Sequence, residues 1–133
     1  MNFKLKWLIF FCSLLVISVS FFVLYNRNYL TEKDYRDNRK DTRVNLVFYK
    51  KGCPYCKAGK SEVIKQSRKS KVRTYFIDVE TEKGINIARS YHVKYAPTIV
   101  VIKNKNYQSF LYARDKGNNI FIEKKKIEEV FKY

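Results

Sequence analysis

The sequence predicts an α/β domain preceded by one N-terminal transmembrane helix, and three observations support this prediction. Near the amino end, residues 7–24 form an apolar run without a charged residue. Beyond this run, short β-rich segments alternate with helix-compatible segments. A Cys-x-x-Cys pair, Cys53 and Cys56, follows the first β-rich segment. The expected parts are a membrane anchor over 1–25, a polar linker over 26–43 and the folded domain over 44–133.

The elements expected in the domain follow the order β-α-β-α-β-β-α, which is typical of a sheet with a parallel part and a terminal hairpin. Apolar, β-branched and aromatic runs predict strands over 44–49, 72–79, 98–103 and 107–114. The helices are expected from Pro54 to about Ser67, over 82–91 and over 122–133.

The composition excludes several classes of protein. The 133 residues suit one compact domain, and 17% aromatic residues exclude ordinary disorder. Three Cys are too few for a disulfide-dense scaffold, and one His rules out a His-rich metal site. The net charge of +16 predicts a solvated basic face, with an anionic lipid or cell-wall surface as the alternative. No nucleic-acid motif accompanies the charge, so no specific nucleic-acid partner is expected.

The apolar run 7–24 is long enough to cross a bilayer when its flanking residues lie at the interfaces. Trp7 and Tyr25 lie at its two ends, as aromatic residues do at membrane surfaces. A signal peptide cleaved near Ser20 is the alternative, but Phe21 and Phe22 continue the run beyond that position. We therefore expect an uncleaved, single-pass anchor in the cell membrane.

The orientation of this anchor is predicted with the domain outside the cytoplasm. Lys4 and Lys6 give a short basic N-terminus before the first apolar segment, which is typical of a signal anchor. The larger number of basic residues after the span favours the opposite orientation by the positive-inside rule. Residues 26–43 are polar and mixed in charge, which favours a linker over a first helix of the domain.

The Cys53-Pro54-Tyr55-Cys56 segment carries the predicted chemistry. Unpaired backbone N–H groups and the helix dipole at a helix start favour the thiolate form of Cys53. Cys53 is therefore expected to attack, and Cys56 to resolve the mixed disulfide one helical turn later.

Two other interpretations of the Cys pair are weaker. A zinc site needs four ligands, and neither a second Cys pair nor a His cluster accompanies this one. A purely structural disulfide across one turn closes too short a loop to stabilise the fold much. No metal and no cofactor are expected beyond a redox-active Cys53–Cys56 disulfide.

Residues 44–133 resemble a thioredoxin-fold domain, with a central mixed sheet flanked by helices. The resemblance rests on the strand 44–49, the Cys53–Cys56 motif, the strand end 77–79 and Ala96-Pro97-Thr98 before an apolar strand. It implies that the bond before Pro97 is cis and that this residue faces the Cys pair. It also implies that extended substrates contact Pro54, Tyr55, Ala96 and Pro97.

The sequence departs from the family pattern at several positions. Cys-Pro-Tyr-Cys is typical of glutaredoxins, yet residues 111–115 lack the Gly-Gly and acidic glutathione motif. Gly52 replaces the Trp that precedes the thioredoxin Cys. Val47 replaces the buried Asp of thioredoxins. The Lys that partners this Asp in thioredoxins corresponds to a position near Thr74. Glutathione use is therefore not predicted. The candidates for the base that deprotonates Cys56 are Lys50 and water.

The predicted function is thiol–disulfide exchange with extracytoplasmic protein substrates; its redox partner protein stays unknown. The anchor and small domain are also similar to membrane-tethered thioredoxin-like proteins of Gram-positive bacteria, including bacteriocin-accessory ones. The alternative function is therefore a thioredoxin-fold accessory or binding module with little catalytic turnover.

Overall fold

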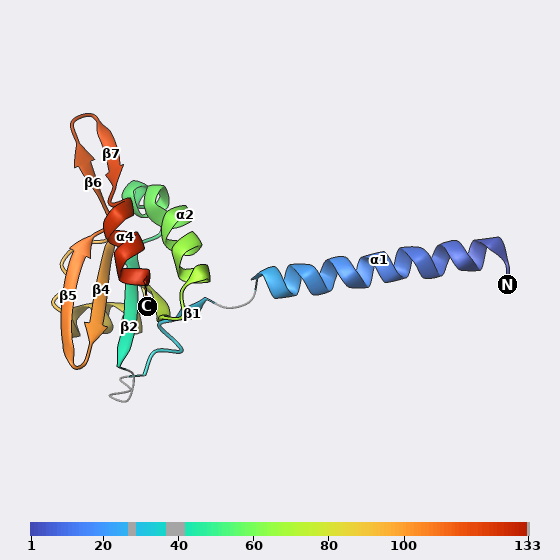
Figure 1. Ribbon diagram of the computed structural model, residues 1–133, viewed down its shortest axis with the longest axis horizontal. Coiled ribbons are helices and arrows are strands. Elements are labelled where there is room, and N and C mark those ends of the chain that lie inside the picture. Colours follow the sequence, from blue (N-terminus) through green and yellow to red (C-terminus); the bar gives the residue numbers. More distant parts are fainter. Residues whose placement is uncertain (27–28, 37–41, 133) are drawn as a thin grey trace.

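The structure, a computed structural model, describes residues 1–26, 29–36 and 42–132. Helix α1 (Phe3–Asn26; blue in Figure 1) occupies the amino end. Its stretch Phe3–Val23 is long and apolar enough to cross a membrane, a property that a signal sequence shares. This helix corresponds to the apolar run 7–24 of the sequence prediction.

A five-stranded mixed sheet forms the centre of the domain, with the strand order β1-β3-β2-β4-β5. The first three strands of this order are parallel: β1 (Leu30–Thr31), β3 (Arg73–Asp78) and β2 (Arg43–Tyr49). The last two are antiparallel: β4 (Thr98–Lys103) and β5 (Asn106–Leu111). The carboxyl ends of β2 and β3 therefore lie at one edge of the sheet, where Tyr49 pairs with Asp78.

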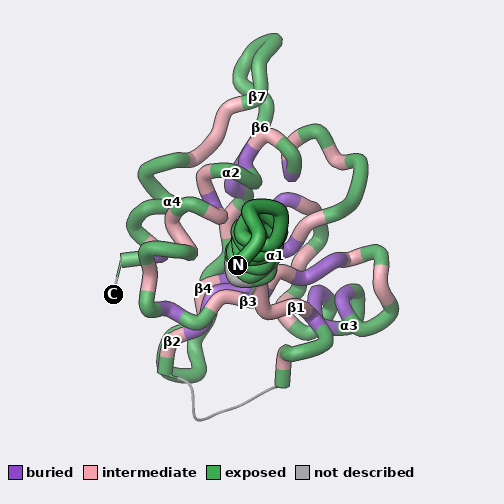
Figure 2. Tube along the Cα trace, turned by 90° about the vertical axis from the view of Figure 1, so that its right-hand side faces the viewer, coloured by how far each residue is buried: buried purple, intermediate pink, exposed green. Residues whose placement is uncertain are grey.

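Helices cover both faces of the sheet, and Figure 1 labels the two on one face, α2 and α4. They are α2 (Pro54–Lys69), α3 (Glu82–Ser90) and α4 (Lys124–Phe131). On one face, Val63 of α2 and Ile127 of α4 pack against Val47 and Ile99 of the sheet. On the other, residues of α3 pack against alternate residues of the same strands, including Leu46 and Phe48. Figure 2 colours the buried residues purple, and both packing layers consist mainly of such residues.

The α/β fold class of the prediction is confirmed, and most element ends lie within one or two residues of those expected. The prediction of a linker over 26–43 is wrong for part of this segment. Leu30 and Thr31 form β1 and pair with Tyr75 and Phe76 of β3. Such a short strand carries no recognisable pattern of its own, because its stability comes from its partner strand. Residues 37–41 of the linker lie outside the described residues.

The chain between β5 and α4 also differs from the prediction of one strand over 107–114 followed directly by a helix. β5 ends at Leu111, and β6 (Ala113–Lys116) pairs with β7 (Asn119–Ile122) as a separate hairpin. The turn has Gly117 at a φ of 63°, which suits the first position of a type II′ turn. Strands of four residues are too short for a clear period-two signal.

Candidate active site

The Cys pair lies where β2 passes into α2, at the carboxyl edge of the parallel strands. Gly52, immediately before the motif, has a φ of 74°, a conformation that residues with a Cβ rarely adopt. Cys53 is the N-cap of α2, and Pro54 takes the first helical position, where its missing N–H costs no hydrogen bond. The local sequence thus places the Cys53 sulfur at the helix start.

Two hydrogen bonds are donated to the Cys53 sulfur. The backbone N–H of Cys56 lies 3.2 Å from it, and the Cys56 thiol donates across a sulfur–sulfur distance of 2.6 Å. Cys53 is half-buried, whereas Cys56 is only 5% exposed. Donated hydrogen bonds stabilise a negatively charged acceptor, so this arrangement suits a Cys53 thiolate and a Cys56 thiol.

Burial raises the pKa of the Cys56 thiol to about 12, and the hydrogen bond that it donates to Cys53 acts in the same direction. Cys56 therefore keeps its proton at neutral pH while Cys53 is reduced. Cys56 is thus both less accessible than Cys53 and held as a thiol, which suits a resolving cysteine.

Tyr112 is a neighbour of the Cys pair that sequence reasoning missed. Its side chain is 2% exposed, and its ring packs against α2 at Gly59, where a Cβ would lie 2.6 Å from the ring. Burial raises the pKa of the Tyr112 hydroxyl, and Cys56 and Cys53 add to this effect. Tyr112 lies within the predicted strand 107–114, and its sequence neighbours give no signal for a contact with α2.

Carboxylates gather at the same edge of the sheet. Asp78 is 4% exposed, and its carboxylate lies 3.6 Å from the ammonium group of Lys51. Its backbone N–H donates to the buried Glu32, 3.2 Å away. Burial, followed by the charges of Asp78 and Glu32, raises the pKa of Tyr49. Val47, at the position of the missing thioredoxin Asp, is buried among apolar side chains instead.

Tyr55, between the two cysteines, is held by a residue that the prediction did not include. Its hydroxyl donates to both carboxylate oxygens of Asp115 in β6, each at 2.9 Å. This hydrogen bond is the main cause that raises the pKa of Tyr55. The turn residues that follow Asp115 were the available signal, because Lys-Gly-Asn-Asn predicts a hairpin turn.

Ala96 and Pro97 lie directly before β4, and their peptide bond is cis. Thr98, the next residue, pairs with Phe48 of β2, so Pro97 lies at the same edge of the sheet as the Cys motif. Pro97 is buried, and its carbonyl oxygen accepts from the backbone N–H of Tyr112 at 3.3 Å. The fold thus brings Pro97, Tyr112 and the end of β2 to one edge.

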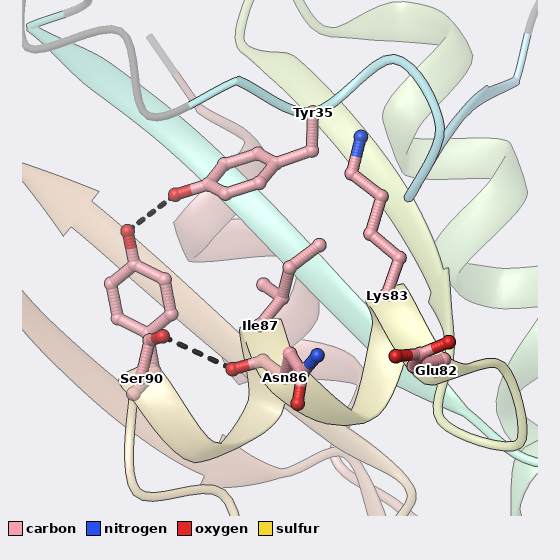
Figure 3. Close-up of a pocket in the computed structure, with 7 residues that line it drawn as sticks. Tyr35, Glu82, Lys83, Asn86, Ile87 and Ser90 are labelled. Atoms are coloured by element: carbon pink, nitrogen blue, oxygen red, sulfur yellow. Dashed lines mark hydrogen bonds between the residues drawn. The ribbon is translucent and has the colours of Figure 1, made fainter.

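A cavity of about 400 Å³ lies elsewhere, against α3 (Figure 3). Tyr35 and Tyr91 line it and join their hydroxyl groups by a hydrogen bond, and Lys83 donates to the carbonyl oxygen of Lys33 at 3.1 Å. None of the predicted site residues lines this cavity. Within the described residues, no group of three His, Cys, Asp or Glu side chains is placed to hold a metal ion.

Comparison with known proteins places these observations in one family. The family model described as thioredoxin matches residues 26–124. Thioredoxin 2 of Plasmodium falciparum (isolate 3D7) is 35% identical over 68 residues, which are 51% of this chain and 43% of that protein. The chain thus spans about half the length, or less, of this relative.

Two solved structures are similar to this chain. The germline-specific thioredoxin Deadhead of Drosophila melanogaster is 29% identical, with a TM-score of 0.52 over 64% of this chain and 86% of that one. Mitochondrial thioredoxin 3 of Saccharomyces cerevisiae, in its oxidized form, is similar in fold. It is 19% identical, with a TM-score of 0.55 over 76% of this chain and 88% of that one. The Cys pair between β2 and α2, the mixed sheet and the family match over most of the chain agree: this chain belongs to the thioredoxin family.

Proposed function

We propose that this chain is a membrane-tethered thiol–disulfide oxidoreductase that exchanges disulfides with protein substrates outside the cytoplasm. The observation that carries the proposal is the Cys53 sulfur at the start of α2, which accepts hydrogen bonds from the N–H and the thiol of Cys56. Thioredoxin-family proteins act on protein thiols and disulfides, which agrees with this geometry.

The reaction begins with the Cys53 thiolate attacking one sulfur of a substrate disulfide. A Cys53–substrate disulfide forms, and the second substrate sulfur leaves as a thiolate that takes a proton from solvent. Cys56 then loses its proton and attacks the Cys53 sulfur. The remaining substrate sulfur leaves as a thiolate, and the enzyme keeps a Cys53–Cys56 disulfide. The reverse sequence oxidises a substrate dithiol, and the reduction potential decides which direction prevails.

The order of the two steps follows from the environment of Cys56. Two causes that raise its pKa, the hydrogen bond to Cys53 and the charge of Cys53, depend on a free Cys53 sulfur. Both disappear when Cys53 enters a mixed disulfide, so the proton of Cys56 becomes easier to remove at that stage. Cys56 is thus held as a thiol until a substrate is attached.

Ala96 and Pro97 complete the proposed site. A free backbone next to a Cys pair can bind an extended substrate segment through main-chain hydrogen bonds. Ala96 is half-buried at the edge of the sheet where β2 ends, which is compatible with this role. Pro54 and Tyr55 would contact the same substrate from the start of α2.

A direct test measures the reduction potential of the purified full chain, together with its rate of exchange with a peptide that contains one disulfide. We expect a defined potential for the Cys pair and turnover that requires both cysteines. A reversible Cys53–Cys56 couple without turnover would instead favour the accessory or binding module.

The membrane part of the proposal has its own test. In intact cells, a thiol reagent that cannot cross membranes should label Cys53 after mild reduction. Labelling only after lysis would place the domain in the cytoplasm, and a shortened protein in the medium would indicate cleavage near Ser20.

A further inference from the structure

The β6–β7 hairpin has no counterpart among the elements that the sequence predicts. It forms a two-stranded sheet of its own, inserted between β5 and α4, and is not paired with the central sheet. Figure 1 shows it projecting from the domain near the end where α2 begins, and Figure 2 shows its tip as exposed. An exposed arm next to the Cys motif is a candidate for contact with substrates.

The base of the hairpin is firmly attached to the domain. Ala113 is buried and Ile122 packs against the core under α2 and α4. The backbone N–H of Glu123 donates to the carbonyl oxygen of Tyr112 at 3.0 Å. Arg114 and Glu123 form an ion pair with a nitrogen–oxygen distance of 2.7 Å. The hairpin therefore leaves the domain in a defined direction.

The two faces of the hairpin differ in their side chains. Arg114 and Lys116 both lie over the ring of Phe121, at 5.2 Å and 4.9 Å from its centroid, and make one face cationic and aromatic. Side chains alternate between the faces of a strand, so Asp115 lies on the same face as buried Ala113. Ile120, the register partner of Asp115, is 39% exposed on that face.

Asp115 connects this second face to the Cys motif. Its two carboxylate oxygens accept from the hydroxyl of Tyr55, the residue directly before Cys56. Both oxygens lie at 2.9 Å, so the hydroxyl is held between them. Beyond the attached base, this contact links the hairpin to the start of α2.

We propose that the β6–β7 hairpin is a specificity element that favours peptide and protein disulfides over small disulfides. Asp115 is its positioning residue, because it holds the hairpin beside the Cys motif through the hydroxyl of Tyr55. This inference rests on the thiol–disulfide exchange proposed above. A small disulfide reaches Cys53 without touching the hairpin, whereas a polypeptide substrate also contacts the arm beside it.

The experiment compares four forms of the full chain in detergent: wild type, Tyr55→Phe, Asp115→Asn and the double variant. Each is assayed with a peptide disulfide and with hydroxyethyl disulfide. We expect each single variant to raise KM for the peptide disulfide. The ratio of kcat/KM for the peptide disulfide to kcat/KM for hydroxyethyl disulfide should fall about threefold. The double variant should fall no further than the larger single change, because both substitutions remove one hydrogen bond.

Hydrogen exchange and control variants separate positioning from general damage. Amides of residues 114–116 should exchange faster in both single variants, while those of β2 stay unchanged. Tyr107→Phe, at the other end of β5, and Glu129→Gln, on the exposed side of α4, should leave the ratio and the exchange unchanged.

Two results would overturn the inference: an unchanged ratio in both single variants, or effects that add fully in the double variant. Failure of the proposed function looks different, because wild type would then turn over neither substrate.

Discussion

The two ends of helix α2 lie in different surroundings. At its amino end, Cys53 caps the helix and Cys56 is buried one turn later. At its carboxyl end, Arg68 donates to the hydroxyl of Tyr29 at 2.7 Å and lies over the Tyr29 ring. The Cys pair is thus at one end of the helix, and the contact with the amino-terminal segment is at the other.

This difference has a consequence for a tethered protein. Tyr29 follows the end of α1, at Asn26, by three residues, which span about 10 Å at most. The 16 residues of α2 extend about 24 Å. If α1 crosses a membrane, the carboxyl end of α2 therefore lies near its surface, and the Cys pair lies at the other end of this helix. One helix thus lies between the amino-terminal segment and the Cys pair.

The largest effect is expected at the amino end. Cys53→Ser should lower the rate of exchange at least about a thousandfold, because it removes the nucleophile. Cys56→Ser should instead accumulate a mixed disulfide with the substrate, because no thiol remains to resolve it. Turnover assays and non-reducing mass spectrometry measure the two outcomes. Comparable turnover in Cys53→Ser would contradict the assignment of the nucleophile.

The second prediction separates the two thiols by pH. In the reduced chain, alkylation of Cys56 near neutral pH should be at least about a hundredfold slower than that of Cys53, because burial protects it and only its thiolate reacts. Its rate should keep rising with pH above 9, since burial, the main cause that raises the pKa of Cys56, persists after Cys53 has reacted. Mass spectrometry of timed samples gives both rates. Equal rates, or a plateau for Cys56 near pH 9, would contradict this environment.

The third prediction concerns the packing that supports the Cys pair. Gly59→Ala should lower the free energy of unfolding by about 1–3 kcal/mol, because the added Cβ meets the buried Tyr112 ring. Chemical denaturation measures the change. Ser61→Ala, on the exposed side of the same helix, is the matched control and should change stability by less than about 0.5 kcal/mol. Equal stability of the two variants would show that the ring adjusts without cost.

The smallest effect is expected at the carboxyl end. Arg68→Ala should lower the free energy of unfolding by less than about 1 kcal/mol, because exposed charged contacts contribute little. The exchange rate should stay unchanged, because the substitution lies more than three helical turns from Cys53. A loss of turnover in Arg68→Ala would show that the two ends of α2 are coupled.

The site features that could be predicted are those that depend on residues close together in the sequence. Cys53, Pro54 and Cys56 could be placed at a helix start because capping and the position of Pro depend on neighbouring residues. The strands around them were recognised because buried β-rich runs have a strong pattern, as in 44–49 and 98–103. The contacts of Tyr55 were not predictable, because Asp115 is 60 residues away in the chain.

Local sequence patterns were sufficient to predict the α/β class, the order of the main elements, the apolar amino-terminal helix and the place of the Cys pair. The remaining features depend on tertiary contacts. Leu30 and Thr31 became a strand only because β3 offers them a partner, and Tyr112 reached α2 only because Gly59 leaves room for its ring. The hairpin over 113–122 contacts the Cys motif through a hydrogen bond between Asp115 and Tyr55, which are distant in the chain. Local propensity cannot encode such contacts, because their free energy arises only when separate elements have already been brought together.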